Sequence, residues 1–342
     1  MRLLLIASPG PGLQAAGFLA QRLRRAGAVV AIGGTPGTDL PQEPLALLAT
    51  DLARRVDGLG LLVEAPNLPV LLRAYRQACA LAAEAGAVVF SGPLEPLSGD
   101  RLQGDLLHRL EVDLLALHGP GEVEEAADLL RGSRYASVPL VPLGLWSLPT
   151  VSGSDGSGYA RRLLFLEQAS LPAGPNGKLP LLRLLMRLAA ASPRWQLLIQ
   201  PPPSGGSPNI SAAAPDEAPL SQLFQQLPAR QRPANLMALT GSDITSALRA
   251  CDTCTSISSP WLFHGLALGR RCLVMGDYGI RTDANMPLFF GSGLIHRFSS
   301  FSSLEELPDS GRASHGWLEQ RGCGISDPGA PLLQAIATQR RP

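Results

Sequence analysis

The stretch MRLLLIASPGPGLQAAGFLAQRLRRAGAVVAIGG, residues 1–34, decides the fold. It starts with a continuous apolar run at residues 2–8, which has the length and composition of a strand buried on both faces. A loop of glycine and proline comes next, followed by an amphipathic helix that Gly27 closes and by a second apolar strand. A strand, a helix and a strand in succession predict a βαβ unit with parallel strands.

The same alternation runs through most of the chain and falls into two halves. In the first half, the predicted strands cover residues 2–8, 28–34, 57–65, 87–92 and 112–119, and the predicted helices 13–27, 68–86, 101–110 and 122–132. In the second half, the strands cover residues 161–168, 195–200 and 234–239 and the helices 179–192, 220–227 and 243–250, before a last strand, helix and strand at 255–280. This alternation predicts an α/β protein whose parallel sheets carry helices on both faces.

A segment rich in Pro, Gly and Ser separates the halves near Thr150, where the periodicity stops. We therefore expect a Rossmann-like domain at residues 1–149, a second one at 150–328, and a short helix with a charged tail at 329–342. A length of 342 residues with 45% hydrophobic content also favours two domains. Two doubly wound domains in tandem are expected to face each other across a cleft at the carboxyl ends of their strands, where such folds bind ligands.

Charge and cysteine content restrict the partners and the compartment. Lys and Arg number 29 against 28 Asp and Glu, so no basic field attracts nucleic acid. Five scattered cysteines do not form a disulfide framework and favour a reducing cytoplasm. The apolar N-terminus reads as a strand rather than a signal peptide, and no apolar run is long enough to cross a bilayer. We expect a cytoplasmic protein without a transmembrane segment, which could also work as a peripheral protein at the inner face of the membrane. The sequence leaves its oligomeric state open.

The segment TSISSPWLFHG, residues 255–265, is the main candidate for a ligand site. Pro260 suits the first position of a helix, which makes Ser259 the expected N-cap and places Ser258 beside the helix entrance. Two hydroxyls, free N–H groups and the positive end of the helix form an anion site. His264 lies about 7.5 Å further along the axis, the distance from a phosphate to an attached ribose. Taken alone, the segment is also an ordinary helix start with a packed histidine, which is the commoner case.

Other chemistries find less support in the sequence. Cys251 and Cys254 are expected to be buried thiols, because no second pair stands at zinc spacing. The chain has no phosphate-binding loop of the G-x-x-x-x-G-K-[ST] type, no G-x-S-x-G elbow and no D-x-D pair. The glycines after the first strand lack the spacing of a dinucleotide site. We therefore expect no metal and no cofactor, only a substrate.

Residues 255–279, TSISSPWLFHGLALGRRCLVMGDYG, resemble the second domain of GT-B glycosyltransferases and nucleotide-sugar 2-epimerases, where a Ser-Ser pair opens a helix that a Gly closes. GDYGIRTDANMPLFFGSGLI and LLFLEQASLPAG resemble an uncharacterised bacterial family of putative glycosyltransferases. The resemblance covers most of the second domain and, more loosely, VVFSGPLEP and HRLEVDLLALHG in the first. It implies a nucleotide-sugar site with these residues: Ser258, Ser259, His264, Gln168, Gln200, Asp277 and Tyr278.

Two positions depart from the pattern of these enzymes. His264 stands where a ribose-binding Glu is usual, and Gln200 stands where relatives carry a basic residue after the strand. A histidine still hydrogen-bonds a hydroxyl, but its charge differs from that of a carboxylate. The missing positive charge near a pyrophosphate is expected to come from Lys178 or Arg281.

An inverting transfer also needs a base that takes a proton from the acceptor hydroxyl. His118, at the end of a predicted strand in the first domain, is the best placed, and Glu95 and Asp100 are the alternatives. The resemblance thus implies a metal-independent glycosyltransferase that uses a nucleotide-sugar donor and a glycan or lipid-linked acceptor, in polysaccharide biosynthesis. A nucleotide-sugar 2-epimerase and a non-catalytic binding homologue of the same fold remain as alternatives.

Overall fold

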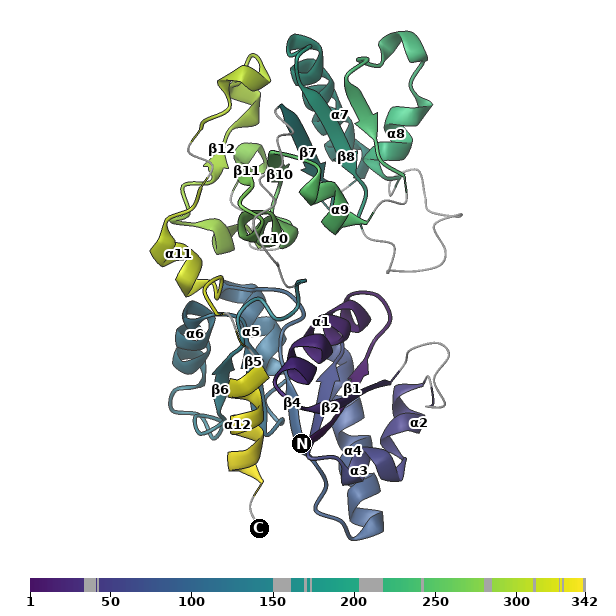
Figure 1. Cartoon of the computed structure of the whole chain (residues 1–342), viewed down its shortest axis with the longest axis vertical. Coiled ribbons are helices and arrows are strands. Elements are labelled where there is room, and N and C mark those ends of the chain that lie inside the picture. The colour runs from purple at the N-terminus through teal and green to yellow at the C-terminus, as the bar shows by residue number, and fades with distance from the viewer. Residues whose placement is uncertain are drawn as a thin grey trace. The chain divides into compact units, whose positions relative to one another are not determined.

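The computed structural model in Figure 1 describes residues 1–33, 41, 43–149, 161–168, 171–172, 174–202, 218–240, 243–279, 285–309, 312–325, 327 and 329–340. The chain divides into two compact units. The first unit is Met1–Pro149 together with Leu318–Pro342, and the second unit is Thr150–Trp317. In the described residues, each unit holds one parallel six-stranded sheet with helices, so the predicted pair of Rossmann-like α/β domains is confirmed.

The sheet of the first unit has the order β2-β1-β3-β4-β5-β6. Its strands are β1 (Arg2–Ala7), β2 (Val29–Gly33), β3 (Gly58–Leu62), β4 (Val88–Ser91), β5 (Leu114–Leu117) and β6 (Leu140–Pro142). Leu4 pairs with Ala31 of β2 on one side and with Leu59 of β3 on the other, which fixes the register of the central strand. The strand β6 lies in the segment where the sequence periodicity stops, and the sequence analysis missed it.

Helices cover both faces of this sheet, because β1 carries apolar side chains on both of its faces. Leu4 and Ile6 point into a cluster with the helices on one face, and Leu3 and Leu5 into a cluster on the other. The first face carries α2 (Pro44–Leu48), α3 (Asp51–Arg55), α4 (Leu68–Ala82), α5 (Gly99–Leu107) and α6 (Pro120–Leu130), and the second face carries α1 (Pro11–Arg25) and α12 (Gly329–Gln339).

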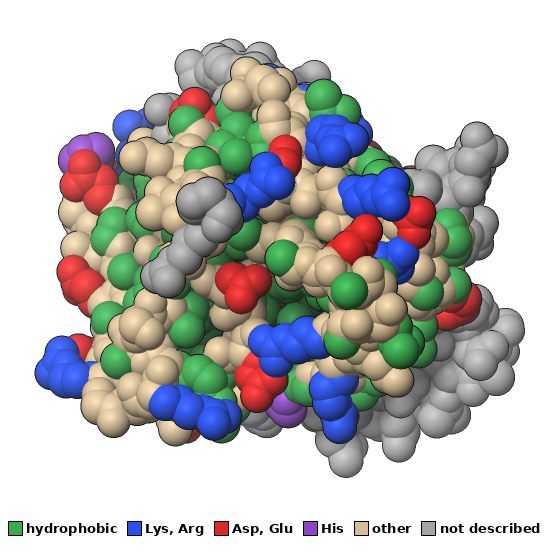
Figure 2. Space-filling view, turned by 90° about the horizontal axis from the view of Figure 1, so that it is seen from below, with side chains coloured by type: hydrophobic (Ala, Val, Ile, Leu, Met, Phe, Trp, Pro, Cys, Tyr) green, Lys and Arg blue, Asp and Glu red, His purple; other side chains and the backbone are tan. Residues whose placement is uncertain are grey.

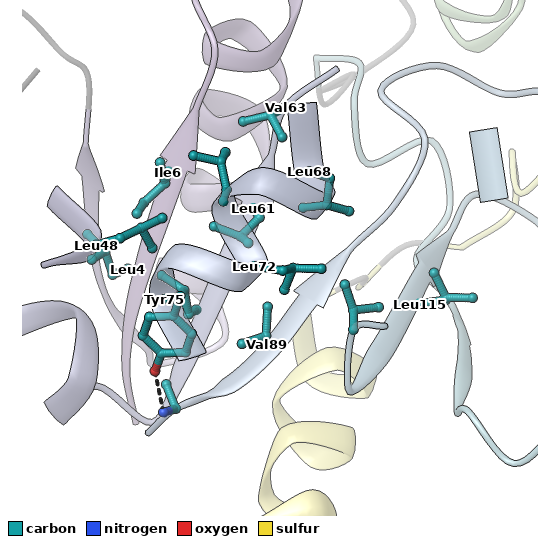
Figure 3. Close-up of a cluster of buried hydrophobic side chains, with 14 of the residues drawn as sticks. Leu4, Ile6, Leu48, Leu61, Val63, Leu68, Leu72, Tyr75, Val89 and Leu115 are labelled. Carbon is teal, nitrogen blue, oxygen red and sulfur yellow. Dashed lines mark hydrogen bonds between the residues drawn. The ribbon is translucent and has the colours of Figure 1, made fainter. Parts of the chain in front are cut away.

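The Tyr75 hydroxyl is a polar group buried inside the first of these clusters (Figure 3). Tyr75 accepts a hydrogen bond from the Ala87 amide at 2.6 Å and donates one to the Ala53 carbonyl at 3.3 Å. Burial raises the pKa of this hydroxyl, so it stays protonated and able to donate. The bonds join α4 to the start of β4 and to α3 without leaving a buried polar group unpaired.

The end of the chain returns to the first unit. The expected division placed residues 150–328 in the second domain and 329–342 in a separate helix and tail, whereas the second unit ends at Trp317. The reason is apolar burial: Leu332 and Ile336 of α12 are fully buried in the same cluster as α1. Gly322 makes the return possible, because it has φ +81° and a Cβ at this position would lie 2.3 Å from the His118 carbonyl oxygen.

The sheet of the second unit has the order β12-β11-β10-β7-β8-β9. Its strands are β7 (Arg162–Leu166), β8 (Gln196–Gln200), β9 (Leu236–Ala238), β10 (Thr253–Ser256), β11 (Arg271–Met275) and β12 (Ile295–His296), and its helices include α7 (Gly174–Ala191), α8 (Leu220–Gln226), α9 (Ile244–Arg249) and α10 (Trp261–Ala267). From β7 the chain builds outward through β8 and β9, then crosses back to β10. The order therefore reverses between β7 and β10, which is the position where doubly wound sheets bind ligands.

The thiols of the second unit are buried, as the sequence predicted for Cys251 and Cys254. The Cys254 Sγ lies 3.1 Å from the Sγ of Cys272 on the adjacent strand. Gly265 of α10 lies over both, because a Cβ there would be 2.6 Å from the Cys254 sulfur and 3.1 Å from the Cys272 sulfur. The absence of a side chain at Gly265 thus allows α10 to pack closely on β10 and β11.

The surface shows the balance of charges that the composition indicates. On the face in Figure 2, Lys and Arg side chains alternate with Asp and Glu side chains rather than forming a field of one sign. Among the described residues, no helix combines the length and the apolar character that a membrane crossing requires.

Candidate functional site

Four neighbouring strands of the second unit bring the predicted substrate residues to one edge of the sheet. Parallel strands end on the same side, and β8, β7, β10 and β11 are consecutive in the sheet. After their carboxyl ends come Gln200, Gln168, the pair Ser258 and Ser259, and the pair Asp277 and Tyr278. The sequence analysis therefore selected residues that share one edge of one sheet.

Gln168 and Ser258 meet across the point where the strand order reverses. The Ser258 amide donates a hydrogen bond to the Gln168 side-chain oxygen at 2.9 Å. The Gln168 side-chain nitrogen lies 3.3 Å from the Ser258 hydroxyl, to which it donates. One carboxamide thus holds both the backbone and the hydroxyl of Ser258.

Ser256 completes this network and was not among the predicted site residues. Its hydroxyl donates to the Leu166 carbonyl at 2.8 Å, accepts from the Ser259 amide at 3.3 Å, and lies 3.3 Å from the Gln168 oxygen. As the last residue of β10 it is fully buried. A serine that ends a buried strand beside the Ser-Ser pair is the signal that could have identified it.

The helix at this site begins one residue later than predicted. Trp261 is the first residue of α10, so Pro260 occupies the N-cap position rather than the first helical position. The Ser259 hydroxyl still caps the helix, because it accepts a hydrogen bond from the Trp261 amide at 3.3 Å. Ser258 and Ser259 are only 2% and 4% exposed, and their amides are bonded within the loop. The loop is therefore held by hydrogen bonds to its amides, and the hydroxyls of Ser258 and Ser259 accept hydrogen bonds from Gln168 and from the Trp261 amide.

His264 packs inside the unit. Its side chain is 1% exposed, and its ring meets the Trp261 ring edge to face with 5.8 Å between the centroids. This is the packing role that the sequence analysis kept as the alternative for a histidine one turn inside a helix. The structure thus gives His264 a packing contact, and its binding to a ribose stays a prediction.

A buried ion pair lies beside Gln168. Glu167 accepts the Leu220 amide at 2.7 Å, and its carboxylate lies 3.8 Å from the Lys178 Nζ, which donates to the Ala218 carbonyl at 3.1 Å. Burial raises the pKa of Glu167. Lys178 was expected to supply positive charge near a pyrophosphate, but it is buried and serves this pair. Arg281, the other expected source, lies outside the described residues.

Gln200, Asp277 and Tyr278 have local partners. The Gln200 side chain donates to the Pro201 carbonyl at 3.1 Å. The two carboxylate oxygens of Asp277 accept the amides of Phe298 and Ser299, each at 2.8 Å, and so cap the short 3₁₀ helix Phe298–Ser300. Burial, with a smaller contribution from the Asp277 charge, raises the pKa of Tyr278 to about 12. Asp277 thus has a structural task that its turn sequence did not reveal.

The three predicted catalytic residues lie in the first unit and differ in accessibility. Asp100 is exposed in the first turn of α5, and Glu95 is half-buried and paired with Arg101 at 2.9 Å. His118 follows β5 and is 1% exposed. Its Nδ1 lies 3.1 Å from Glu122 and its Nε2 lies 3.0 Å from the Ser147 hydroxyl, so both ring nitrogens are engaged inside the protein.

The described part of the chain brings no three His, Cys, Asp or Glu side chains together in a way that could hold a metal ion. The arrangement in the second unit is instead one of neutral hydroxyl and carboxamide groups at the end of a parallel sheet. Groups of this kind bind phosphate and sugar oxygens by hydrogen bonds.

Comparison with known proteins identifies a family and a fold for the chain. Residues 24–329 match the model of a family described as "Putative glycosyltransferase (DUF6716)". No curated protein matches the chain.

Solved structures with the same fold include glycosyltransferases and an epimerase. The glycosyltransferase SnogD from Streptomyces nogalater is 16% identical, with a TM-score of 0.52 and 99% of each chain covered. Arabidopsis thaliana UGT89C1 complexed with quercetin is 12% identical, with a TM-score of 0.58 and 99% of each chain covered. UDP-GlcNAc 2-epimerase from Neisseria meningitidis bound to UDP-GlcNAc is 13% identical, with a TM-score of 0.54, covering 99% of this chain and 100% of that chain. These similarities establish the GT-B fold that the sequence analysis expected.

Proposed function

The chain belongs to the DUF6716 family of glycosyltransferase-like proteins, and we propose that it transfers a sugar from a nucleotide-activated donor to an acceptor hydroxyl. The donor site is the carboxyl edge of β7 and β10 in the second unit. The observation that carries the proposal is the network of Gln168, Ser256 and Ser258, which presents hydroxyl groups where the strand order reverses.

In this proposal the hydroxyls of Ser258 and Ser259 bind the phosphate oxygens of the donor. Both side chains are held beside the start of α10, and hydroxyl donors to phosphate need no metal ion. Gln168 keeps Ser258 in place rather than binding the donor directly, since its carboxamide is already bonded to Ser258. Gln200 and Tyr278 lie at the ends of β8 and β11 on the same edge of the sheet and supply further contacts to the donor, while His264 and Asp277 support the structure around the site.

For the base, the proposal favours the segment that runs from the end of β4 into the first turn of α5. Glu95 in the loop is half-buried and Asp100 in the helix is exposed, so a carboxylate from this segment can meet an acceptor hydroxyl directly. His118 is enclosed by Glu122 and Ser147 and would first have to leave them. A glycan or lipid-linked acceptor of polysaccharide synthesis and a cytoplasmic location complete the proposal, and all five cysteines are free thiols, which suits a reducing compartment.

The experiment is thermal stabilisation of the protein by a panel of nucleoside mono- and diphosphates. A ligand that binds only the folded state raises the unfolding temperature, so one nucleotide should stand out. Ser258→Ala and Ser259→Ala should reduce that shift, and Ser299→Ala, an exposed serine of the same unit, should leave it unchanged. If no nucleotide stabilises the wild-type protein, the donor site is refuted and a non-catalytic role gains support.

Products then separate transfer from epimerisation. With the nucleotide sugar that matches the nucleotide found, a transferase releases the free nucleotide in the presence of an acceptor. A 2-epimerase returns a nucleotide sugar with an inverted carbon and releases little free nucleotide. Asp100→Asn and Glu95→Gln are expected to slow transfer by about 10²–10⁴-fold if that side chain is the base.

A further inference from the structure

A second reactive centre lies in the first unit, around Ser147. The Ser147 hydroxyl is 3.0 Å from His118 Nε2, and His118 Nδ1 is 3.1 Å from a carboxylate oxygen of Glu122. The three side chains come from the end of β5, from α6 and from the loop after β6. We propose that Ser147 is an activated nucleophile that reacts with small uncharged esters, with His118 as its base and Glu122 as the group that orients His118.

Glu122 determines which nitrogen of His118 carries the proton. One of its oxygens accepts the Leu97 amide at 3.0 Å, and the other accepts the amide of His118 itself. An ionised carboxylate only accepts hydrogen bonds, so the facing Nδ1 must hold the ring proton. Nε2 is then the bare nitrogen, and the Ser147 hydroxyl donates to it. This is the order of groups that activates a serine in acyl transfer.

The loop that carries Ser147 is fixed on both sides. Arg22 donates one hydrogen bond to the Leu145 carbonyl and one to the Leu148 carbonyl, each at 2.9 Å. Burial lowers the pKa of Arg22 to about 10, which is still above neutral pH, so the guanidinium stays charged. The His118 ring is stacked on the Trp146 ring, with 5.3 Å between centroids and 10° between planes. Ser147 and His118 are thus positioned before any ligand binds.

Burial and polarity around the three residues indicate the kind of substrate. Exposure is 8% at Ser147, 3% at Glu122 and 1% at His118, so Ser147 is the most accessible residue of the three. Trp146 and Leu148 beside it are buried and apolar, which favours an uncharged acyl group over an ionic one. The Trp146 indole N–H is buried without a partner among the described residues, and it is the donor available to the oxygen of a tetrahedral intermediate.

The reaction balances without any further reagent except water. The Ser147 oxygen forms a bond to the ester carbonyl carbon while its proton moves to His118 Nε2. The bond from that carbon to the alkoxy oxygen breaks, and the leaving group takes the proton and departs as an alcohol. Water then attacks the acyl-serine with the same nitrogen as base, which releases the carboxylic acid and restores the Ser147 hydroxyl.

The test is covalent labelling of the full-length protein with diisopropyl fluorophosphate, a small uncharged probe that phosphorylates activated serines and releases fluoride. Mass spectrometry of the peptides gives the labelling rate of each serine. Ser98 is the internal control, because it lies in the same unit and is also 8% exposed, but it has no hydrogen-bond partner for its hydroxyl in the described residues. We expect Ser147 to be labelled at least about 100-fold faster than Ser98.

Variants then test the role of His118. His118→Asn should slow labelling of Ser147 and hydrolysis of p-nitrophenyl acetate by about 10²–10⁴-fold, and Ser147→Ala should abolish both. Labelling of Ser147 at the rate of Ser98 overturns the proposal, and so does a rate that His118→Asn leaves unchanged. If His118→Asn does not fold, the comparison of the two serines in the wild-type protein decides the question by itself.

Discussion

The Ser258 amide and the Gln168 side-chain oxygen, 90 residues apart in the sequence, are 2.9 Å apart in the structure. The bond joins the residue that follows β10 to the residue that follows β7, at the reversal of the strand order. Backbone hydrogen bonds of the sheet end before this position, so side chains must hold the two loops together. Gln168 does so with an uncharged group, so the link between the two loops adds no negative charge that would repel a phosphate.

Replacing Gln168 by alanine should loosen the Ser258 loop. The Ser258 amide would lose its acceptor while remaining buried, at a cost of about 1–3 kcal/mol. Hydrogen exchange of the Ser258 amide should accelerate, and urea unfolding should begin at a lower concentration. Gln222→Ala, at an exposed position of α8, is the control and should change neither. Unchanged exchange at Ser258 in Gln168→Ala would contradict the assigned role of Gln168.

Alanine at two helical glycines should act with opposite sign. In Gly265→Ala the new Cβ would press on the sulfurs of Cys254 and Cys272, and we expect a loss of about 1–2 kcal/mol. Gly17 lies in α1 with nothing within 4 Å of its added Cβ. Gly17→Ala should therefore gain up to about 1 kcal/mol from helix propensity alone. Calorimetric unfolding of both variants measures the contrast, and equal responses would mean that α10 does not pack on the thiols as described.

The stability of the second unit should fall with rising pH because of Glu167. Burial raises the pKa of this carboxyl, so the folded chain binds a proton that the unfolded chain releases above about pH 4.3. The stabilisation is complete below that pH and is lost as the pH rises through the raised value. Glu167→Gln removes the titration but keeps an oxygen for the Leu220 amide. Between about pH 5 and about pH 8, urea unfolding should show that the wild type loses more stability than Glu167→Gln. If the difference in stability between the two proteins is the same at both pH values, Glu167 is not the group responsible.

Gly322 should tolerate no side chain. Gly322→Ala combines a positive φ, which costs an alanine about 1–2 kcal/mol, with a Cβ 2.3 Å from the His118 carbonyl oxygen. We expect a loss of more than about 3 kcal/mol, measured by urea unfolding. Gly132→Ala is the matched control, because φ is +74° there and no atom lies within 4 Å of the added Cβ. The difference between the variants isolates the contact with His118, and a difference near zero would show that the returning segment packs elsewhere.

Much of the fold could be predicted because apolar runs determine where strands lie. Residues 2–8 predicted β1, and the break near Thr150 matches the division after Pro149. The sequence missed β6 and β12, which are only three and two residues long, too short for a periodic signal. The sequence analysis also assigned α12 to a separate segment outside the first domain. The pattern of a helix in the sequence does not indicate which sheet the helix packs against.

The sequence indicated where the residues of the candidate site lie in the sheet, but not which of their side chains form hydrogen bonds with each other. Strand ends can be read from the sequence, so Gln168 and Ser258 were placed at one edge of a sheet. Which side chains bond to each other depends on strand order, and the neighbours β7 and β10 are not consecutive in the chain. His118 was selected as a base without its partner Ser147, 29 residues away, because the sequence analysis missed β6, the strand beside β5 that Ser147 follows. The roles of these residues in binding and catalysis remain predictions.

The return of the chain at Gly322 has a consequence for the order of events during translation. Domains at the start of a chain commonly fold while the rest is still being made. Here the core of the first unit includes Leu332 and Ile336, which leave the ribosome after the whole of the second unit. On one face of the first sheet, the part that α12 covers stays exposed until then, although α1 already covers the rest. The second unit, although encoded later, is the first whose residues are all available, and the two units mature in the reverse of their order in the sequence.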